Sequence, residues 1–436
     1  MVIPMQSPVG TMAASADGDR ALPIPSRTEA EGYVAMVCFK HGPPRLHGVE
    51  LEWTVHHAAD PARPLDTEDL RRALGPHCPL TLDPDSPHRP LAAGSLVTVE
   101  PGGQVEISTA PSESVSALIA STRADATQTG RLLESAGLVR GEHAIDAHRP
   151  PRRILHTPRY DAMQDYLDGV GPHGVRMMCS TASLQVCLDA GEAHEVAARW
   201  RAVHALGPAL TALFANSPTV AGRDTGWASS RLRSTLATAP PVTDAPALEG
   251  DPSAAYARMA LDAPLLCLRR PTPPWTAPAG ATFADWLADP SPGGAFGRPA
   301  TWQDLDYHLT TLFPPVRPQG YLEVRYLDAQ PGDGWVAPVA LLTALTARAA
   351  TIDRVLDLTG ESAGRWLPAA RDGLADPVVA RAAVAVVELG CAAMADTDLD
   401  RGLAGEVHDL LLRALAAAPD RRPVSRRCSA WPPHRT

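Results

Sequence analysis

The sequence predicts an α+β fold in which a largely antiparallel central sheet is backed by helices. Segments typical of strands separate helical ones without regular βαβ alternation. The clearest local signal is a hairpin, in which the β-branched runs 95–100 and 104–108 flank Pro101-Gly102-Gly103. The stretch from Val336 to Ala418 is rich in Ala and Leu and predicts several helices.

The remaining elements follow from periodicity and capping residues. The alternation from Leu46 to Val55 predicts a strand, and Asp66 begins a short helix with acids in its first turn. Beyond the hairpin we expect, in order, a helix over 112–138, a helix over 159–169, a strand over 175–189, a helix over 192–214 bent at Gly207-Pro208, a helix over 301–313 and a strand over 320–327.

The composition divides the chain into four parts. We expect a flexible N-terminal segment over 1–30, a catalytic sheet-and-helix domain over 31–335, a helical C-terminal part over 336–420 packed on it, and a frayed tail over 421–436. The Pro/Gly-rich stretch 290–299 is a candidate lid, because reactive groups in an active site often have to be shielded from water.

Composition also excludes several classes of function. The net charge of −10 disfavours nucleic acid and anionic membranes as partners. The single lysine, Lys40, is followed by His41 and Gly42, which excludes a Walker loop, and it offers no basis for Schiff-base chemistry. The apolar stretches near Arg348 and Arg381 are interrupted too early to cross a bilayer, and no secretory signal is recognisable, so a cytoplasmic location is expected.

Four strand-like segments carry polar residues at alternate positions, which places each pair on one face of its strand. The pairs are Glu50 with Glu52, Gln104 with Glu106, Ser183 with Gln185, and Glu323 with Arg325. A single such pair is typical of a solvated outer face, but here the intervening positions are apolar in all four segments. If the polar faces converge, their carboxylates need neutralisation, and an all-oxygen ligand set is what Mg²⁺, or alternatively Mn²⁺, prefers.

A set of motifs in the same order along the chain resembles the glutamate-cysteine ligases of the plant and bacterial type. The likeness includes the actinobacterial group that serves ergothioneine biosynthesis. These are carboxylate-amine ligases with a fold related to glutamine synthetase, and the resemblance implies that the antiparallel sheet forms a funnel-like active site. The motifs are Gly48-Val-Glu-Leu-Glu52, Pro101-Gly-Gly-Gln-Val-Glu-Ile-Ser108, Thr157-Pro-Arg-Tyr-Asp-Ala-Met163, the segment from Met177 to Asp189, Phe214-Ala-Asn-Ser-Pro218 and Gly320-Tyr-Leu-Glu-Val-Arg-Tyr-Leu-Asp328. The chain departs from the family at Met177-Met178-Cys179-Ser180, where we expect an Arg- or Thr-containing sequence such as Met-Met-Arg-Thr.

The resemblance implies ATP-dependent joining of the glutamate γ-carboxylate to the amine of cysteine through a γ-glutamyl phosphate. ATP is then a co-substrate, the partners are small molecules, and the chain acts as a monomer or homodimer. Carried over by position, the metal ligands are Glu50, Glu52, Glu106, Glu323 and Gln185. Arg325 and Glu52 are the catalytic candidates, and the substrate-binding candidates are Asn216, Arg223, Arg231 and Gln104.

Three alternatives stay open at this point. The amine substrate can differ from cysteine, because no residue is identified that recognises a thiol. The same carboxylates could serve a metal-dependent phosphohydrolase or a scaffold that binds ATP and metal without catalysis. The glycines of 169–174 match a dinucleotide-binding spacing, but a preceding helix and an expected following strand are the wrong context for it.

Overall fold

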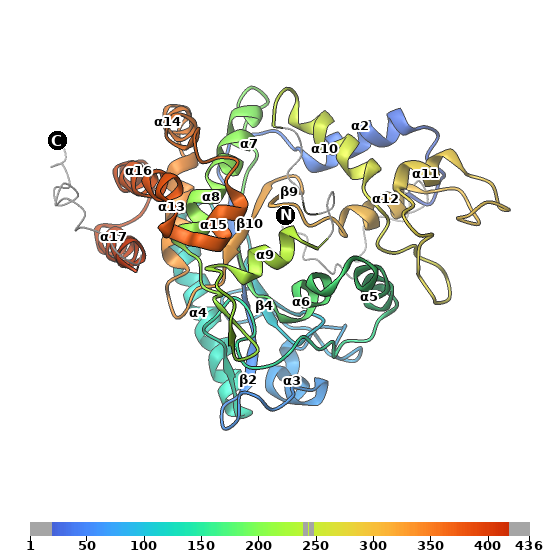
Figure 1. The fold of residues 1–436 in the computed structure, drawn as a ribbon, viewed down its shortest axis with the longest axis horizontal. Coiled ribbons are helices and arrows are strands. Elements are labelled where there is room, and N and C mark those ends of the chain that lie inside the picture. The colour runs from blue at the N-terminus through green and yellow to red at the C-terminus, as the bar shows by residue number, and fades with distance from the viewer. Residues whose placement is uncertain (1–19, 239–242, 244–247, 418–436) are drawn as a thin grey trace.

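A six-stranded antiparallel sheet organises the molecule in the computed structural model, which describes residues 20–238, 243 and 248–417 (Figure 1). Across the sheet the strands are β3 (Leu96–Val99), β4 (Val105–Ser108), β1 (His47–Trp53), β6 (Ser183–Leu188), β10 (Leu322–Asp328) and β9 (Val316–Pro318). Every neighbouring pair runs antiparallel, which confirms the α+β class and the antiparallel sheet expected from the sequence.

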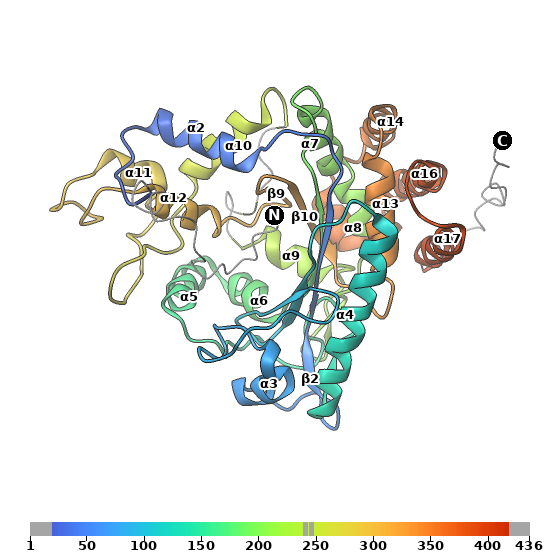
Figure 2. The same cartoon turned by 180° about the vertical axis from the view of Figure 1, so that it is seen from behind.

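Helices cover both sides of this sheet (Figure 2). On one side lie α4 (Val115–Ser135), α7 (Val196–Ala205), α8 (Gly207–Leu213), α13 (Val336–Thr346), α14 (Ala349–Thr359), α15 (Trp366–Asp372), α16 (Pro377–Ala393) and α17 (Arg401–Ala416). On the other side lie α5 (Pro158–Val170), α6 (Pro172–Ser180) and α9 (Ser230–Leu236), with α2 (Arg27–Cys38), α10 (Pro252–Asp262), α11 (Phe283–Ala288) and α12 (Trp302–Leu309) beyond them. The short helix α3 (Thr67–Leu74) lies near the strand pair β2 (Val55–His57) and β5 (Leu138–Arg140), and β7 (Thr219–Val220) pairs with β8 (Arg223–Asp224).

The core lies between the sheet and the first of these layers. All residues of α13 are buried, and the apolar alternate positions of the strands, such as Val49, Leu51 and Val324, belong to the same core. The segment Pro377–Asp396 is long and apolar enough to cross a membrane by length and composition alone. Half of the most apolar 18-residue stretch of this segment is buried inside the molecule, as in the core helix of a soluble protein. The segment is therefore weak evidence for a membrane span.

The hairpin and most helices follow the sequence expectation, and α7 and α8 separate at Gly207 as expected for the bend. The strand expected over 175–189 is wrong in its first half, because residues 172–180 form α6 and only Ser183–Leu188 is strand. Pro172 occupies the first turn of α6, where a missing N–H costs nothing. Thr181 then donates to the carbonyl of Met177 as the helix ends.

Helix α2 begins at Arg27, so ordered structure starts before the end of the segment expected to be flexible. Residues 1–19 and the tail expected over 421–436 lie outside the described residues. The domain boundaries proposed from composition remain predictions.

Candidate active site

The structure brings the polar alternate positions of four strands onto one face of the sheet. Glu52 lies directly opposite Glu106 across β1 and β4, and Glu50 lies opposite Gln185 across β1 and β6. Glu323 lies opposite Cys187 across β10 and β6. This register follows from the apolar pattern, since a shift by one residue would turn every carboxylate into the core.

Gln185 connects the carboxylates at the centre of this face. Its Nε2 donates to Glu52 Oε1 at 2.9 Å and to Glu106 Oε1 at 3.5 Å, and its Oε1 accepts from the Arg325 guanidinium. The backbone N–H of Ser183 donates to Glu52 Oε2 at 2.6 Å. The amide therefore holds Glu52 and Arg325 in fixed positions and has the orientation that this network requires.

The carboxylates on the β3–β4–β1 side carry charge that the protein does not neutralise. Burial, with repulsion from Glu106 and Glu52, raises the pKa of Glu100 to about 8. Burial, with repulsion from Glu52, raises the pKa of Glu106 to about 7, although Thr98 donates to its Oε2 at 2.5 Å. Burial, with Glu106 and Glu323 nearby, also raises the pKa of Glu50 well above its ordinary range.

Glu323, on the other side of the same face, is in the opposite situation. Arg317 donates to its two oxygens at 2.7 Å and 3.2 Å, and Arg325 donates to Oε2 at 2.8 Å. Burial alone would raise the pKa of Glu323, but Arg317 and Arg325 outweigh burial and lower it to about 2. Glu323 is therefore a permanent anion held between two cations.

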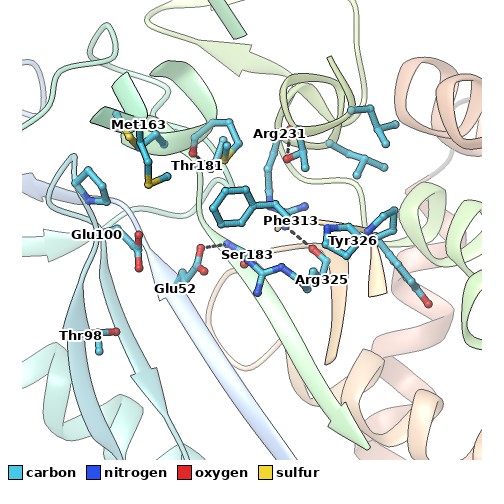
Figure 3. Close-up of a pocket in the computed structure, with 18 of the residues that line it drawn as sticks. Glu52, Thr98, Glu100, Met163, Thr181, Ser183, Arg231, Phe313, Arg325 and Tyr326 are labelled. Carbon is cyan, nitrogen blue, oxygen red and sulfur yellow. Dashed lines mark hydrogen bonds between the residues drawn. The ribbon is translucent and has the colours of Figure 1, made fainter. Parts of the chain in front are cut away.

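A cavity lies over this face, between the sheet and helices α5, α6 and α9 (Figure 3). Figure 3 shows the carboxylates of Glu52 and Glu100 pointing toward one another at one end. Thioether and aromatic side chains, among them Met163, Met178 and Phe313, also line the cavity. The cavity thus combines carboxylates with apolar side chains, an arrangement typical of a site that binds small polar molecules.

Arg231 lines the cavity from α9 and is buried. Its Nη2 donates to the carbonyl of Arg325 at 2.5 Å, whereas its buried Nη1 makes no hydrogen bond and lies 3.6 Å from Asp328. Asp328 accepts from Ser217 and Ser229, and Ser229 is the N-cap of α9. Asp328 therefore fixes the start of the helix that carries Arg231.

The structure does not bring three of the substrate-binding candidates into the cavity. The Gln104 amide donates to the carbonyls of Met178 and Thr181 and so attaches the hairpin to α6. The Asn216 amide donates to the carbonyls of Glu142 and Ala329, and Arg223 is exposed on the β7–β8 ribbon. Polar residues near a motif can equally hold loops together, and sequence spacing alone did not separate the two roles.

The proposed lid over 290–299 also lies away from the cavity, at the outer edge near α11 (Figure 1), and none of its residues is among those that line the cavity. Arg298 donates to both oxygens of Asp304 at 2.6 Å and 2.8 Å, and its guanidinium stacks over Trp286. The loop is therefore attached to α11 and α12, and the structure gives the lid hypothesis no support.

Sequence reasoning missed Glu100, Arg317 and Cys187. Glu100 was detectable, because it continues the period-two series from Thr98 into the hairpin and so shares a face with Glu106. Arg317 becomes visible only in the β9–β10 register, where it lies opposite Glu323. Cys187 lies opposite Glu323 across the sheet, and its thiol lies at the carboxylates.

The buried carboxylates suit divalent cations. Single donor atoms of Glu50, Glu323 and Cys187 lie within 4.8 Å of one another, and repulsion among Glu52, Glu100 and Glu106 is unrelieved by arginine contacts comparable to those of Glu323. Such crowding of anions out of water is costly unless cations neutralise them. Carboxylate and amide oxygens match the preference of Mg²⁺ and Mn²⁺.

Comparisons with known proteins identify relatives of this chain. The model of glutamate-cysteine ligase family 2 matches residues 46–414. Glutamate-cysteine ligase EgtA of Mycobacterium tuberculosis strain H37Rv is 38% identical over 382 residues, or 84% of each chain, and EgtA of Mycolicibacterium smegmatis is 36% identical over 388 residues, or 87% of this chain and 88% of that relative. The chloroplastic glutamate-cysteine ligase of Arabidopsis thaliana is 33% identical over 289 residues, which is 65% of this chain and 54% of the plant protein.

Among solved structures, the glutamate-cysteine ligase of Francisella tularensis in complex with AMP aligns with a TM-score of 0.49 and 12% identity, covering 86% of this chain and 83% of that one. The family match covers the whole sheet and the helices from α3 to α16. The family resemblance and the enzyme class expected from the motifs are therefore confirmed, and the chain belongs to glutamate-cysteine ligase family 2 and is a ligase.

Proposed function

We propose that this chain joins the γ-carboxylate of L-glutamate to the amine of L-cysteine and hydrolyses ATP to ADP and phosphate in the process. The observation that carries the proposal is that buried carboxylates and Arg325 share one face of the sheet beside a cavity. The relatives of this chain are named glutamate-cysteine ligases.

The reaction needs an activated carboxyl group, because a carboxylate would have to expel oxide. An oxygen of the glutamate γ-carboxylate attacks the γ-phosphorus of ATP and ADP leaves. The amine of cysteine then attacks the acyl carbon, phosphate leaves, and the nitrogen loses its proton. Both substrates of the first step are anionic, so the site must supply positive charge.

The residues that would hold divalent cations are Glu50, Glu52 and Glu106, with Gln185 beside them and Glu100 added by the structure. Glu323, which already pairs with Arg317 and Arg325, would take part only at the side where it approaches Glu50. Bound there, such ions would neutralise charge between phosphate and carboxylate oxygens. Arg325 is only partly buried and keeps its place through Glu323 and Gln185, so it offers a fixed positive charge toward the cavity. Arg231, with a buried Nη1 that no hydrogen bond satisfies, is suited to the α-carboxylate of glutamate.

The test is ADP release with ATP and Mg²⁺, measured with glutamate and a panel of amines. We expect release that requires glutamate and cysteine together. Release with glutamate and another amine would identify a different acceptor, release with neither substrate would indicate a phosphohydrolase, and none under any condition a scaffold. A cytoplasmic location, and a role of the product in ergothioneine biosynthesis, remain predictions that go with this assignment.

A further inference from the structure

Strand β6 brings one sulfur atom to the carboxylate face. Cys187 follows Gln185 by two residues and therefore points to the same side of the sheet. It lies opposite Glu323 on β10 and opposite Gly48 on β1. A Cβ at Gly48 would lie 3.3 Å from the Cys187 Cβ, so the absence of a side chain at Gly48 leaves room for the thiol.

The thiol forms a compact set of donors with two carboxylates. One donor atom of each of Glu50, Cys187 and Glu323 lies within 4.8 Å of the other two, and all three side chains are buried. These three residues are named here the Glu–Cys–Glu group. Arg325 lines the cavity and contacts Glu323 directly, so the group lies one side chain away from the cavity.

Two of the three donors keep a free lone pair. Cys187 is 5% exposed, and its thiol makes no hydrogen bond among the described residues. Among the same residues, Glu323 Oε2 accepts from both Arg317 and Arg325, whereas Oε1 accepts from Arg317 alone at 3.2 Å. A buried free cysteine often acts as a small apolar residue, but two carboxylate groups are unsuitable neighbours for such a role.

This donor set differs from the all-oxygen set on the β3–β4–β1 side. Thiolate sulfur is a soft ligand that selects Zn²⁺, whereas Mg²⁺ takes oxygen ligands. With Zn–S at about 2.3 Å and Zn–O at about 2.1 Å, the ligands of a tetrahedral zinc site lie about 3.6 Å apart. The three donor atoms, which are at most 4.8 Å apart, would have to approach by about 1 Å, which rotation of the side chains can supply.

We propose that the Glu–Cys–Glu group binds Zn²⁺, with water as the fourth ligand, and that zinc inhibits the enzyme from this site. Binding needs only the three residues, whereas inhibition rests on the proposed ligase function. Zinc would occupy Glu50, which that function assigns to the catalytic cations. It would also compete with Arg325 for Glu323 and so disturb the positive charge that Arg325 offers to the cavity.

The binding experiment uses the full chain without metal, and Co²⁺ as a spectroscopic substitute for zinc. A cobalt–thiolate bond gives an intense ultraviolet charge-transfer band, which we expect in the unmodified chain and which added Zn²⁺ should abolish. Cys187→Ser should remove this band. It should also lower the Zn²⁺ affinity measured by calorimetry by about 100-fold, because loss of an outer contact alone costs roughly 10- to 100-fold.

Cys78→Ser is the matched control for this experiment. Cys78 is also a free, buried cysteine, but it ends the 3-10 turn that follows α3 and does not belong to the Glu–Cys–Glu group. The control should keep the cobalt band and the zinc affinity of the unmodified chain. Circular dichroism checks that Cys187→Ser is folded, and Cys187→Ala replaces it if it is not.

The inhibition experiment measures ADP release with ATP, Mg²⁺, glutamate and cysteine. A zinc buffer fixes the free Zn²⁺ concentration, because cysteine itself binds zinc. Each rate is divided by the zinc-free rate of the same chain, so a change in basal activity has no influence on the result. The unmodified chain and Cys78→Ser should be inhibited at the same free Zn²⁺ concentration, and Cys187→Ser should need about 100-fold more.

The two experiments separate the zinc site from the ligase function. The absence of a cobalt–thiolate band in the unmodified chain, or an equal band in Cys187→Ser, would overturn the zinc site whatever the activity. Loss of the band in Cys187→Ser with unchanged inhibition by zinc would overturn inhibition from this site. If no condition gives ADP release, the ligase function is wrong, and a band that depends on Cys187 still supports the zinc site.

Discussion

The two halves of the carboxylate face differ in how the chain compensates buried negative charge. On the β10 side, Glu323 is held by Arg317 and Arg325, and its pKa is lowered to about 2. On the β3–β4–β1 side, burial and mutual repulsion raise the pKa of Glu106 to about 7 and that of Glu100 to about 8. The same residue type in the same sheet is thus neutralised by the protein in one half and left uncompensated in the other.

This difference indicates that the two halves of the carboxylate face have different roles. Glu323 and its arginines form a rigid charged element whose state does not change with pH near neutrality. The negative charge of the carboxylates in the other half has to be balanced by bound ligands. Divalent cations would supply the positive charge at neutral pH. Three of the predictions below alter one half and leave the other intact, and one alters the neighbouring pair of Asp328 and Arg231. They begin with the largest expected effect.

Glu50→Gln should lower kcat by about 100-fold or more, because it removes charge that would hold a cation while changing little volume. The folded state should be as stable as before in the absence of metal, since an uncompensated buried carboxylate is lost. Steady-state ADP release across a Mg²⁺ titration, with circular dichroism to check the fold, measures both. Near-normal turnover at limiting Mg²⁺ would remove Glu50 from the ion-binding set.

Glu323→Gln should destabilise the protein by about 3 kcal/mol, because it leaves the buried Arg317 without its anion. The matched control is Glu361→Gln, which removes a carboxylate from an exposed pair with Arg381 and should cost about 0–1 kcal/mol. Urea unfolding of both variants gives the comparison. Equal, small losses would show that the Arg317 contact contributes little to stability.

Asp328→Asn should act through Arg231 and raise the KM for glutamate several-fold while changing kcat less. The asparagine keeps its bonds to Ser217 and Ser229 only in part and loses the charge opposite Arg231. A merely structural role predicts equal effects on the KM for ATP and for glutamate. Initial rates with each substrate varied in turn distinguish these results.

Glu100→Gln should raise the thermal midpoint of the metal-free protein by a few degrees at pH 8 and by less at pH 5. The pKa of Glu100 is raised from an ordinary 4.5 to about 8, so its destabilising effect is absent below pH 4.5 and grows as pH rises toward 8. Thermal unfolding in EDTA at the two pH values measures this. Adding Mg²⁺ should give the unmodified chain a larger gain at pH 8 than the variant, and identical gains would contradict a cation at Glu100.

Much of the fold could be predicted because its signals are local. The hairpin follows from the β-branched runs on either side of Gly102 and Gly103. Gly102 is also required by a tertiary contact, because a Cβ there would lie 1.9 Å from the carbonyl oxygen of Cys179. The strand predicted over 175–189 was wrong in its first half, because an apolar run such as Met177-Met178-Cys179 suits a buried helix as well as a strand. Only the packing of α6 on α5 and α9 decides between them.

The amino-acid sequence by itself determined which side chains share a strand face, because side-chain direction alternates with period two and the apolar positions can face only the core. The sequence therefore predicted that the carboxylates of Glu50, Glu52, Glu106 and Glu323 lie on the polar faces of their strands. Tertiary structure decided which of them meet an arginine, as Glu323 does through Arg317, and which do not. It also made Gln104 a structural link between the hairpin and α6. Such pairings depend on register and helix packing between distant segments, and charge acts over a few ångströms in space irrespective of separation along the chain.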